Sequence, residues 1–314
     1  MNIAIDMMGG DFAPEQAVNG VHQYLSSHSS PAFLLLIGDE KSIAPLLTQE
    51  QIPADSVKIV HASQVIDMHE HPTKALKEKP DSSISIGFKW LASGKADAFI
   101  SAGNTGTMLV GSLFSIKAIE GVQRPTISTI IPRENGKTGL LLDVGLNADC
   151  KPEVLNQFAI LGSLYAQDIL GIENPKTGLI NIGEEEGKGN ILAQAAFPLL
   201  KENPQINFIG NVEGRDILLD KADVMVCDGF TGNIILKLAE SLFDITERQQ
   251  IHHDYFDRFN FENYGGTPVL GVAKPVIIGH GISHGKAFKN MIILAEKMIA
   301  SGLMQKMKKS FEGN

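Results

Sequence analysis

The sequence predicts a three-layer α/β protein in which a mainly parallel sheet carries helices on both faces. Three observations support this prediction. Short apolar runs alternate with stretches of helical periodicity along the 314 residues. The runs are continuously apolar, as in strands that are buried on both faces. Glycine-rich turns follow many of these runs, and loops of that kind lie at the ligand-binding edge of such sheets.

The first half of the chain begins with a strand and a loop, in which Asp11 is suited to cap a helix and Pro14 to occupy its first turn. The polar stretch at 67–83 is expected to be exposed. Strands are expected at 3–6, 33–37, 57–60 and 98–100, and helices at 14–25, 82–93 and 105–119.

The second half opens with two strands on either side of Asn135 and Gly136, a pair that favours a hairpin turn. Strands are then expected at 177–182, 206–210, 224–226 and 276–278, and helices at 152–170, 191–202, from 234 onward, and at the C-terminal end. No linker rich in proline, serine or glycine divides the chain, so residues 1–314 are expected to form a single catalytic domain.

Two segments of the chain are very similar. Lys95–Gly106 (the first copy) reads KADAFISAGNTG and Lys221–Gly232 (the second copy) reads KADVMVCDGFTG, with six of twelve positions identical. Each is an apolar run that ends in Gly-x-Thr-Gly and leads into a helical pattern. Glycine lets the backbone approach a ligand closely, and the free amides at a helix start favour an anion. The two copies are either anion-binding turns or turns that only join a strand to a helix.

Composition limits the classes of function. A net charge of −9 argues against broad nucleic-acid binding, and the two cysteines form neither a disulfide framework nor a metal-ligand pattern. The sequence has no N-terminal leader pattern and no run of about 18 apolar residues. We therefore expect a cytoplasmic protein.

Several well-known motifs are missing from the turns. GEEEGKGN at 183–190 lacks the spacing of a P-loop, and MGGD after the first strand is not a dinucleotide fingerprint. Neither a zinc-binding motif nor a serine-hydrolase elbow occurs. We therefore predict that the protein uses no cofactor and no metal.

The turns nevertheless carry many polar residues. Donors at helix starts can bind a phosphate-sized anion, and a nearby carboxylate can hold a basic partner or remove a proton. For each residue the alternative is a cap or turn role, and for Lys237 it is a solvated surface charge. The donors are Asn104, Thr105, Asn147, Lys188, Asn190, Arg215, Asn233, Lys237 and His280, and the carboxylates are Asp6, Asp143, Glu213 and Asp228.

Ten motifs along the chain include IAIDMMGGDFAPE, AFISAGNTG, GVQRPTIS, LLDVGLNADCKPEVLNQFA, GLINIGEEEGKGN, NFIGNVEGRDI, ADVMVCDGFTGNIILK and HGISHGKA. Together they resemble the bacterial phosphate acyltransferase (PlsX) family. The resemblance implies a fold similar to phosphotransacetylases and isocitrate-dehydrogenase-like enzymes. It implies transfer of a fatty acyl group from acyl carrier protein to inorganic phosphate, which gives acyl phosphate for phospholipid synthesis. It also implies a homodimer, peripheral contact with the inner face of the membrane, and a downstream glycerol-3-phosphate acyltransferase that uses the acyl phosphate.

This reaction suits the available side chains, because phosphate is itself the nucleophile and the thiolate leaving group is stable. The protein must align phosphate with the carbonyl and stabilise the oxyanion, so Cys227 is expected to be only a small buried residue. The first copy is assigned to phosphate and the second to the acyl-pantetheine side. The predicted catalytic residues are Lys188, Asn190, Asn233 and His280, and the predicted substrate-binding residues are Asn104, Thr105, Gly106, Asn147, Arg215, Asp228, Thr231 and Lys237.

Two segments are candidates for contact with a membrane, a second chain or the carrier protein. Residues 240–264, expected to protrude as a helical and aromatic insertion, hold six acids and two arginines. The family that the chain resembles has a longer, apolar and basic hairpin there, which is thought to touch the membrane. The aromatic residues are expected either to reach a membrane or to pack in a dimer interface. The segment from Lys286 has six lysines and two glutamates, and it is either a docking surface for the acidic carrier protein or a solvated helix face.

Two other functions fit the same features. A phosphotransacetylase-type enzyme that acts on coenzyme A thioesters would share the fold and the anion turns. A non-catalytic scaffold for lipid-synthesis enzymes would use the apolar helix and the aromatic segment. Acyl phosphate formation by the purified protein separates the scaffold from the enzymes, and the preferred thioester separates the two enzymes.

Overall fold

A computed structural model describes residues 1–312 of the chain, so the last two residues of the predicted domain lie outside the described part. The chain forms two compact units. Unit 1 contains residues 1–117 and 261–304, and unit 2 contains residues 118–260 and 305–314. The expectation of a single catalytic domain with a protruding insertion stays a prediction.

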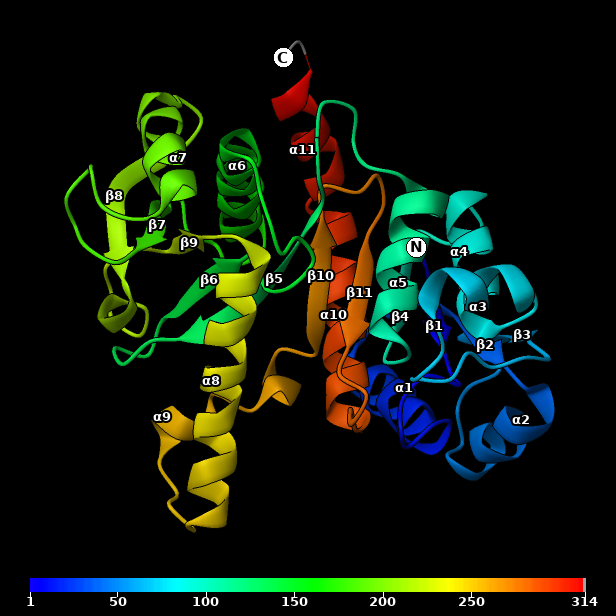
Figure 1. Cartoon of the computed structure of the whole chain (residues 1–314). Coiled ribbons are helices and arrows are strands. Elements are labelled where there is room, and N and C mark those ends of the chain that lie inside the picture. Colours follow the sequence, from blue (N-terminus) through cyan, green and yellow to red (C-terminus); the bar gives the residue numbers. More distant parts are fainter. Residues whose placement is uncertain (313–314) are drawn as a thin grey trace. The chain divides into compact units, whose positions relative to one another are not determined.

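Unit 1 is built on a mainly parallel set of strands in the order β3-β2-β1-β4-β11-β10 (Figure 1). The first five strands are parallel, and β10 is antiparallel to β11. The strands are β1 Asn2–Asp6, β2 Phe33–Gly38, β3 Val57–His61, β4 Ala98–Ser101, β10 Gly266–Leu270 and β11 Val276–Gly279. The helices are α1 Glu15–Ser27, α2 Glu40–Gln49, α3 Pro72–Glu78, α4 Ser83–Ala92, α5 Thr105–Gly111 and α10 Gly285–Ala300.

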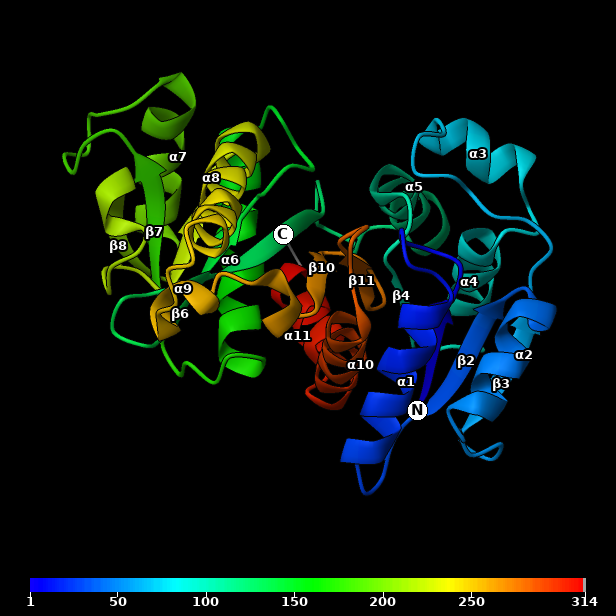
Figure 2. The ribbon, with the colours of Figure 1, turned by 90° about the horizontal axis from the view of Figure 1, so that it is seen from below.

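Helices cover both faces of the strands in unit 1 (Figure 2). On one face α1 and α10 pack together, with Gly20 of α1 against Phe288 of α10. On the other face the rings of Phe88 in α4 and Phe99 in β4 meet edge to face, with centroids 5.1 Å apart. These side chains are almost fully buried, and burial of such large apolar side chains is the main source of stability here.

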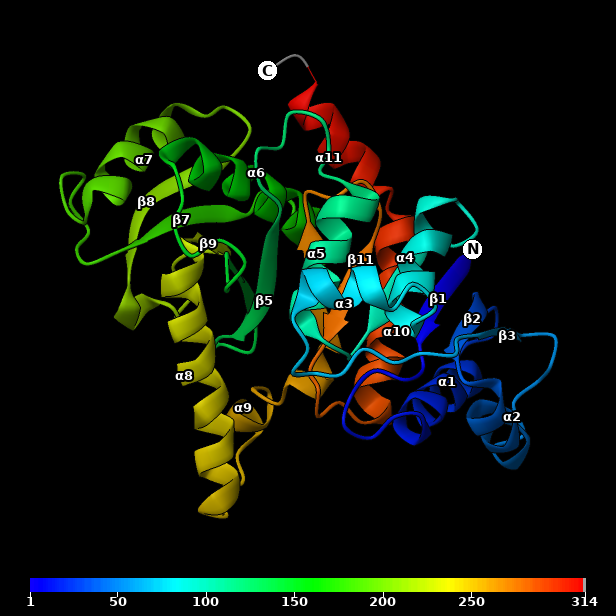
Figure 3. The same cartoon turned by 45° about the vertical axis from the view of Figure 1, so that its right-hand side comes forward.

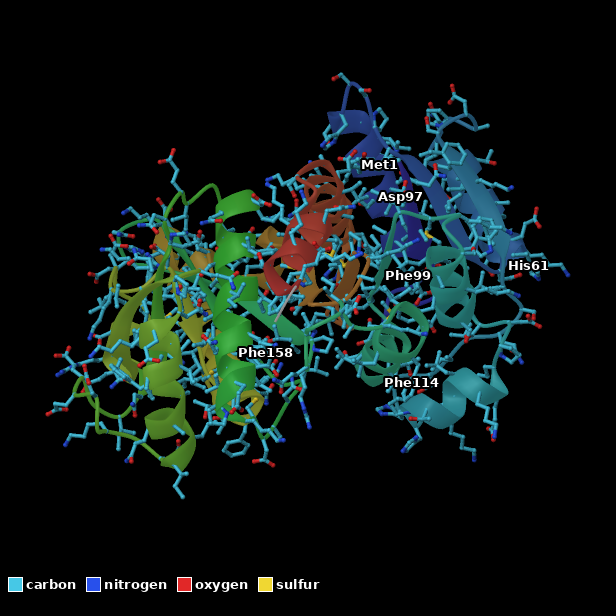
Figure 4. The ribbon with its side chains drawn as sticks, turned by 90° about the horizontal axis from the view of Figure 1, so that it is seen from above. Met1, His61, Asp97, Phe99, Phe114 and Phe158 are labelled. Atoms are coloured by element: carbon cyan, nitrogen blue, oxygen red, sulfur yellow. The ribbon has the colours of Figure 1, made fainter. Side chains whose placement is uncertain are left out.

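Unit 2 has strands in the order β5-β6-β9-β7-β8, of which β5 is antiparallel to β6 and the others are parallel. The strands are β5 Thr126–Pro132, β6 Thr138–Leu142, β7 Lys176–Asn181, β8 Asn207–Glu213 and β9 Val224–Val226. The helices are α6 Pro152–Asp168, α7 Ile191–Glu202, α8 Gly229–Arg248, α9 Asp254–Asp257 and α11 Leu303–Phe311, of which the first two residues of α11 belong to unit 1. In α6 the ring of Phe158 is fully buried (Figure 4), whereas α8 extends well beyond the strands of its unit (Figure 3).

The predicted α/β fold class, a mainly parallel sheet packed with helices, is confirmed. The hairpin is confirmed as well, since β5 and β6 are antiparallel and Gly136 has a φ of 85°. Among the described residues, no helix is long and apolar enough to cross a membrane.

The polar stretch at 67–83 is largely exposed, as expected, and it contains the short helix α3, which starts at Pro72 because proline is tolerated in a first turn. Three local predictions were wrong. The helix expected from residue 234 begins at Gly229, because Asp228 caps it. The helix expected to reach residue 119 ends at Gly111 and continues only as one π-helical turn, Ser112–Ile116. Asp11 does not cap α1, because its N-cap position is Pro14, which has no side-chain hydrogen bond.

Candidate active site

The two similar copies occupy equivalent positions in the two units. The first copy contains β4, which pairs with β1, and the second contains β9, which pairs with β7 in the same register. Asp97 Oδ2 accepts a hydrogen bond from the backbone N–H of Asn2 at 2.7 Å. Asp223 Oδ2 accepts one from the backbone N–H of Lys176 at 2.8 Å. The repeat in sequence is therefore a repeat in structure.

Asn104 holds the turn of the first copy. Its Oδ1 accepts a hydrogen bond from the Thr107 N–H at 2.9 Å and thereby caps α5. Its Nδ2 donates to the carbonyl oxygens of Asp67, Met68 and Glu70 at 3.0 to 3.1 Å. The side chain is only 4% exposed and its polar atoms are engaged, so Asn104 anchors the segment that leads into α3. Its role in substrate binding, with those of Thr105 and Gly106, stays a prediction.

The turns after β1, β4 and β11 meet at one edge of unit 1, as the sequence predicts. Ser101 Oγ donates to Asp6 Oδ2 at 2.6 Å, and the Asp11 N–H donates to the Gly281 carbonyl at 2.8 Å. Complete burial raises the pKa of the Asp6 carboxyl, although the hydrogen bond from Ser101 opposes the shift. His280 follows β11 at this edge, and its exposed ring lies 5.0 Å from the ring of Phe261.

The turn of the second copy is capped by a different residue. Asp228 Oδ1 accepts from the Thr231 N–H at 2.8 Å and Oδ2 accepts from Thr231 Oγ1 at 3.0 Å. Asp228 aligns with Ala102 of the first copy, so α8 begins two positions earlier than α5 does. A Cβ atom at Gly232 would overlap the Asp143 carbonyl oxygen, so only glycine permits this close packing.

Asn147 connects the second copy to the end of β6. Asp143 Oδ2 accepts hydrogen bonds from Asn147 N and Nδ2 at 2.6 and 2.8 Å. Asn147 Nδ2 also donates to the Pro125 carbonyl at 2.8 Å, and the Asn147 carbonyl accepts from the Gly229 N–H at 2.7 Å. Asn147 is 6% exposed, so its observed contacts are structural, and its role in substrate binding stays a prediction.

Two buried asparagines fix the GEEEGKGN loop that follows β7. Asn181 accepts from the Ile182 N–H at 2.8 Å and donates to the Lys188 carbonyl at 3.1 Å. Asn211 Nδ2 donates to the Glu185 carbonyl at 2.8 Å. Gly189 permits the return of the chain, because its φ of 98° is a conformation that side chains disfavour.

Two of the three glutamates in this loop are already paired. Lys221 lies 2.6 Å from Glu184, and Lys201 lies 2.5 Å from Glu186. The Lys188 ammonium, by contrast, has no ion pair or hydrogen bond within residues 1–312, and its side chain is exposed. A positive charge on a fixed loop, beside partly neutralised carboxylates, is available to an anion.

Asn233 has a similar position in the next loop. It lies in the first turns of α8, its exposed side-chain amide has no hydrogen bond within the described residues, and it contacts Gly145. Lys188 and Asn233 follow β7 and β9, which are adjacent parallel strands. Because the carboxyl ends of parallel strands share one edge, both side chains belong to the same edge of unit 2.

The other predicted residues of unit 2 have local partners. Asn190 Oδ1 caps α7 by accepting from the Ala193 N–H at 2.8 Å. Lys237 pairs with Glu240 at 2.7 Å, and Arg215 pairs with Glu213 at 2.6 Å. Lys237 and Arg215 are 55% and 74% exposed, and exposed ion pairs contribute only about 0–1 kcal/mol. The alternative for Lys237, a solvated surface charge, matches this geometry, and the three proposed roles stay predictions.

Neither cysteine is suited to act as a thiolate. Cys227 is 3% exposed, as expected for a small buried residue, and burial raises its pKa well above the usual value. Burial, together with the carboxylates of Asp143 and Asp228, raises the pKa of the Cys150 thiol to about 12. At neutral pH both thiols are therefore protonated and poorly nucleophilic.

Within the described part of the chain, the edge of unit 2 thus offers an unpaired ammonium, an unpaired amide and helix starts, but no activated nucleophile. Such donors can bind an anion and stabilise an oxyanion. In the described part of the chain, no group of three or more His, Cys, Asp or Glu side chains is arranged to hold a metal ion. Sequence reasoning missed Asn181 and Asn211, although a polar residue at the end of an apolar run is the signal that could have found them.

Comparisons with known proteins show the family of the chain. The family described as "Fatty acid synthesis protein" matches residues 1–254 and 248–306. The phosphate acyltransferase of Dictyoglomus turgidum is 43% identical, over 95% of this chain and 94% of its own length. That of Desulforamulus reducens is 41% identical, over 100% of this chain and 98% of its own length.

Solved structures share the fold at low sequence identity. A phosphotransacetylase from Streptococcus pyogenes superposes with a TM-score of 0.68 at 19% identity, over 96% of this chain and 94% of that one. A branched-chain phosphotransacylase from Enterococcus faecalis superposes with a TM-score of 0.63 at 16% identity, over 95% of this chain and 99% of that one. The fold, the turns and the full-length relatives together show that this chain belongs to the phosphate acyltransferase family.

Proposed function

We propose that the protein transfers a fatty acyl group from the thioester of acyl carrier protein to inorganic phosphate and releases acyl phosphate. Acyl transfer to phosphate is supported by the family, whose members are named phosphate acyltransferase and fatty acid synthesis protein. The observation that carries the site assignment is the exposed, unpaired ammonium of Lys188 on a loop fixed by Asn181 and Asn211.

In the proposed reaction a phosphate oxygen attacks the carbonyl carbon of the thioester. A C–O bond forms, the C–S bond breaks, and the thiolate leaves with the bonding electron pair. Lys188 holds the phosphate, and the Asn233 amide donates to the carbonyl oxygen as negative charge develops there. Asn190 stays a candidate for the same oxyanion role, although its Oδ1 is engaged in capping α7, and the catalytic role of His280, which belongs to unit 1, stays a prediction. This scheme requires no thiolate from Cys150 or Cys227.

The test is a donor comparison with the purified protein. Phosphate is supplied with acyl carrier protein thioester or with coenzyme A thioester, and acyl phosphate is followed by ³¹P NMR. We expect the carrier-protein thioester to have the higher kcat/KM. A preference for coenzyme A thioesters would favour a phosphotransacetylase-type enzyme. If neither donor gives acyl phosphate, the result would favour the non-catalytic scaffold function.

We also propose that α11 docks the acidic carrier protein. Lys306 is already paired with Asp168 at 2.7 Å, so the exposed Lys308 and Lys309 carry the docking charge. Reversal of both charges should raise the KM for the carrier-protein thioester and weaken its salt dependence. Because coenzyme A has no protein surface to dock, its thioester serves as the control, and an equal effect on both donors would contradict this docking site.

We further propose that the protein forms a homodimer through α8. Phe230, Ile234 and Leu238 lie at spacings of four residues and are 65%, 53% and 65% exposed, which supports an apolar contact with another surface. A Leu238→Glu variant should be a monomer by light scattering. If this variant keeps the dimer mass and loses flotation with liposomes instead, α8 contacts the membrane and not a second chain.

A further inference from the structure

A surface cavity in unit 2 contains none of the residues assigned so far as substrate-binding or catalytic. Its volume is about 310 Å³, and it is lined by Gln123, Arg124, Asp149, Cys150, Lys151 and Val154. All of these residues come from two sequence motifs, GVQRPTIS at 121–128 and LLDVGLNADCKPEVLNQFA at 141–159. The fold therefore brings together two motifs whose charged residues have no role in the reaction described above.

The walls of the cavity are held in place by hydrogen bonds behind them. Gln157 of α6 accepts from the Gln123 N–H and donates to the Gly121 carbonyl, both at 2.8 Å. Asn147 donates to the Pro125 carbonyl at 2.8 Å, and its own carbonyl accepts from the Cys150 thiol at 3.7 Å. Because the two segments are fixed before a ligand arrives, little ordering cost remains for binding.

The charge of the lining suits a singly charged anion. Arg124 and Lys151 are exposed cations, and within residues 1–312 neither side chain forms an ion pair or a hydrogen bond. With Asp149 as the one lining carboxylate, the cavity has a formal charge of +1. Charge-assisted hydrogen bonds from guanidinium and ammonium groups are the usual means of holding a phosphate in proteins.

The rest of the lining suits a larger ligand than free phosphate. The cavity volume lies at the lower end of the range of small-molecule sites, about 300–1000 Å³, and exceeds what a five-atom ion fills. Gln123 offers an amide and Val154 an apolar contact, which match a chain of amide and methyl groups. The cavity also adjoins the second copy, because the Asn147 carbonyl accepts from the Gly229 N–H at 2.7 Å.

We propose that this cavity binds the phosphodiester end of the phosphopantetheine arm of the thioester donor, with Arg124 and Lys151 contacting the phosphate. The inference rests on the proposed function, since the proposed reaction is what supplies such an arm. The arm is common to acyl carrier protein and coenzyme A. The thioester end of the arm then extends toward the turn of the second copy, where the Asn233 amide can donate a hydrogen bond to the thioester carbonyl.

The test compares donors with and without the phosphate. Arg124→Gln, Lys151→Met and the double variant are assayed with acyl carrier protein thioester, with coenzyme A thioester, and with acyl-pantetheine, which lacks the phosphate. Each single variant should raise the KM for the carrier-protein thioester about tenfold, with kcat and the KM for inorganic phosphate unchanged. The KM for acyl-pantetheine should not change. Lys41→Met, an exposed lysine of α2, is the matched control and should behave as wild type.

Three outcomes would overturn the inference. An increase in the KM for inorganic phosphate would assign the cations to the nucleophile. An equal increase in the KM for acyl-pantetheine would show that the cavity does not bind the phosphate of the arm. An effect with coenzyme A thioester alone would assign the cations to the additional phosphates of coenzyme A.

Calorimetry separates this inference from the proposed function, because binding needs no turnover. The wild type should bind 4′-phosphopantetheine at least about tenfold more tightly than pantetheine, and the double variant should lose the difference. Retention of the difference by the double variant would overturn the inference. If the difference is present but no acyl phosphate forms, the proposed function fails and the cavity assignment stands.

Discussion

The first and second copies begin alike and end differently. In both, an aspartate accepts a hydrogen bond from the backbone N–H at the start of the neighbouring strand. Beyond the strands, Asn104 caps α5 and is buried in contacts with the segment before α3, whereas Asp228 caps α8 two positions earlier. The earlier cap leaves Asn233 free on the outer side of α8. The first turn is an anchor, whereas the second leaves the side-chain amide of Asn233 exposed.

This comparison bears on the division of labour predicted from the sequence. Phosphate was assigned to the first copy and the acyl-pantetheine side to the second. Because the Asn104 side chain is engaged, the backbone amides and the exposed Thr105 of the first copy remain for an anion, and the cation Lys188 lies in the other unit. The division stays a prediction, which the following variants sharpen.

The largest effect is expected for Lys188. Lys188→Met should lower kcat/KM for phosphate by about 10²–10³, because the charge that holds the nucleophile is lost. The melting temperature should stay unchanged, since the side chain is exposed and unpaired. Lys41→Met is the matched control, because Lys41 is an exposed lysine of α2 that lies outside the predicted site. Equal rates for the two variants would remove Lys188 from the site.

The next effect tests the common part of the two copies. Asp223→Asn should lower the free energy of unfolding by about 1.5–3 kcal/mol, because Asp223 pairs at 3.0 Å with the fully buried guanidinium of Arg133, which keeps a second carboxylate partner, Asp220, at 2.6 Å. The equivalent Asp97→Asn should cost under about 1 kcal/mol, since Asp97 is exposed and accepts a single backbone hydrogen bond. Urea unfolding measures both. Similar losses would mean that the pairing with Arg133 adds nothing.

The two asparagines should separate stability from catalysis. Asn104→Ala should cost about 2 kcal/mol, from the lost cap and the three carbonyl partners left without a donor. Asn233→Ala should leave stability unchanged and lower kcat about tenfold or more. Thermal unfolding and initial rates on the same preparations measure this. The reverse pattern would show that the second copy is the structural one.

The smallest effect concerns pH. β1 ends in Asp6, whose pKa is raised by burial above 3.8, whereas β7 ends in the neutral Asn181. The folded state therefore holds the Asp6 proton to higher pH than the unfolded state does, so the stabilisation is complete below pH 3.8 and is lost as pH rises through the raised pKa. Asp6→Asn should show a weaker decline of unfolding free energy over this window. An unchanged pH profile would contradict the raised pKa.

Much of the fold follows from patterns within single segments. The continuous apolar runs, the hairpin at Asn135-Gly136 and the helix at 191–202 are local signals, and the structure confirms them. The start of α8 was misplaced because Asp228 competes with later residues as the cap. α3 was missed because its exposed polar residues lack an apolar stripe, and tertiary contact with Asn104 orders the segment before it.

The candidate site was predictable only in part. Its residues could be gathered from the turns, because parallel strands place their carboxyl ends together. Which side chains are free could not be read from the sequence, since Asn104 and Asn233 look alike until their partners are known. Asn211 and Gln157 act through contacts with backbone groups that are distant in the sequence, so their partners could not be predicted. Asn181 contacts the backbone of its own loop, and its position at the end of an apolar run was the available signal.

The most direct test of the proposed acyl transfer to phosphate detects the phosphorus of the product. ³¹P NMR of the purified protein with acyl carrier protein thioester and inorganic phosphate should show an acyl phosphate signal that grows as free thiol is released. The signal should be absent without the thioester and nearly absent with Lys188→Met. Thiol release without an acyl phosphate signal in the wild type, or an undiminished signal with Lys188→Met, would contradict the account.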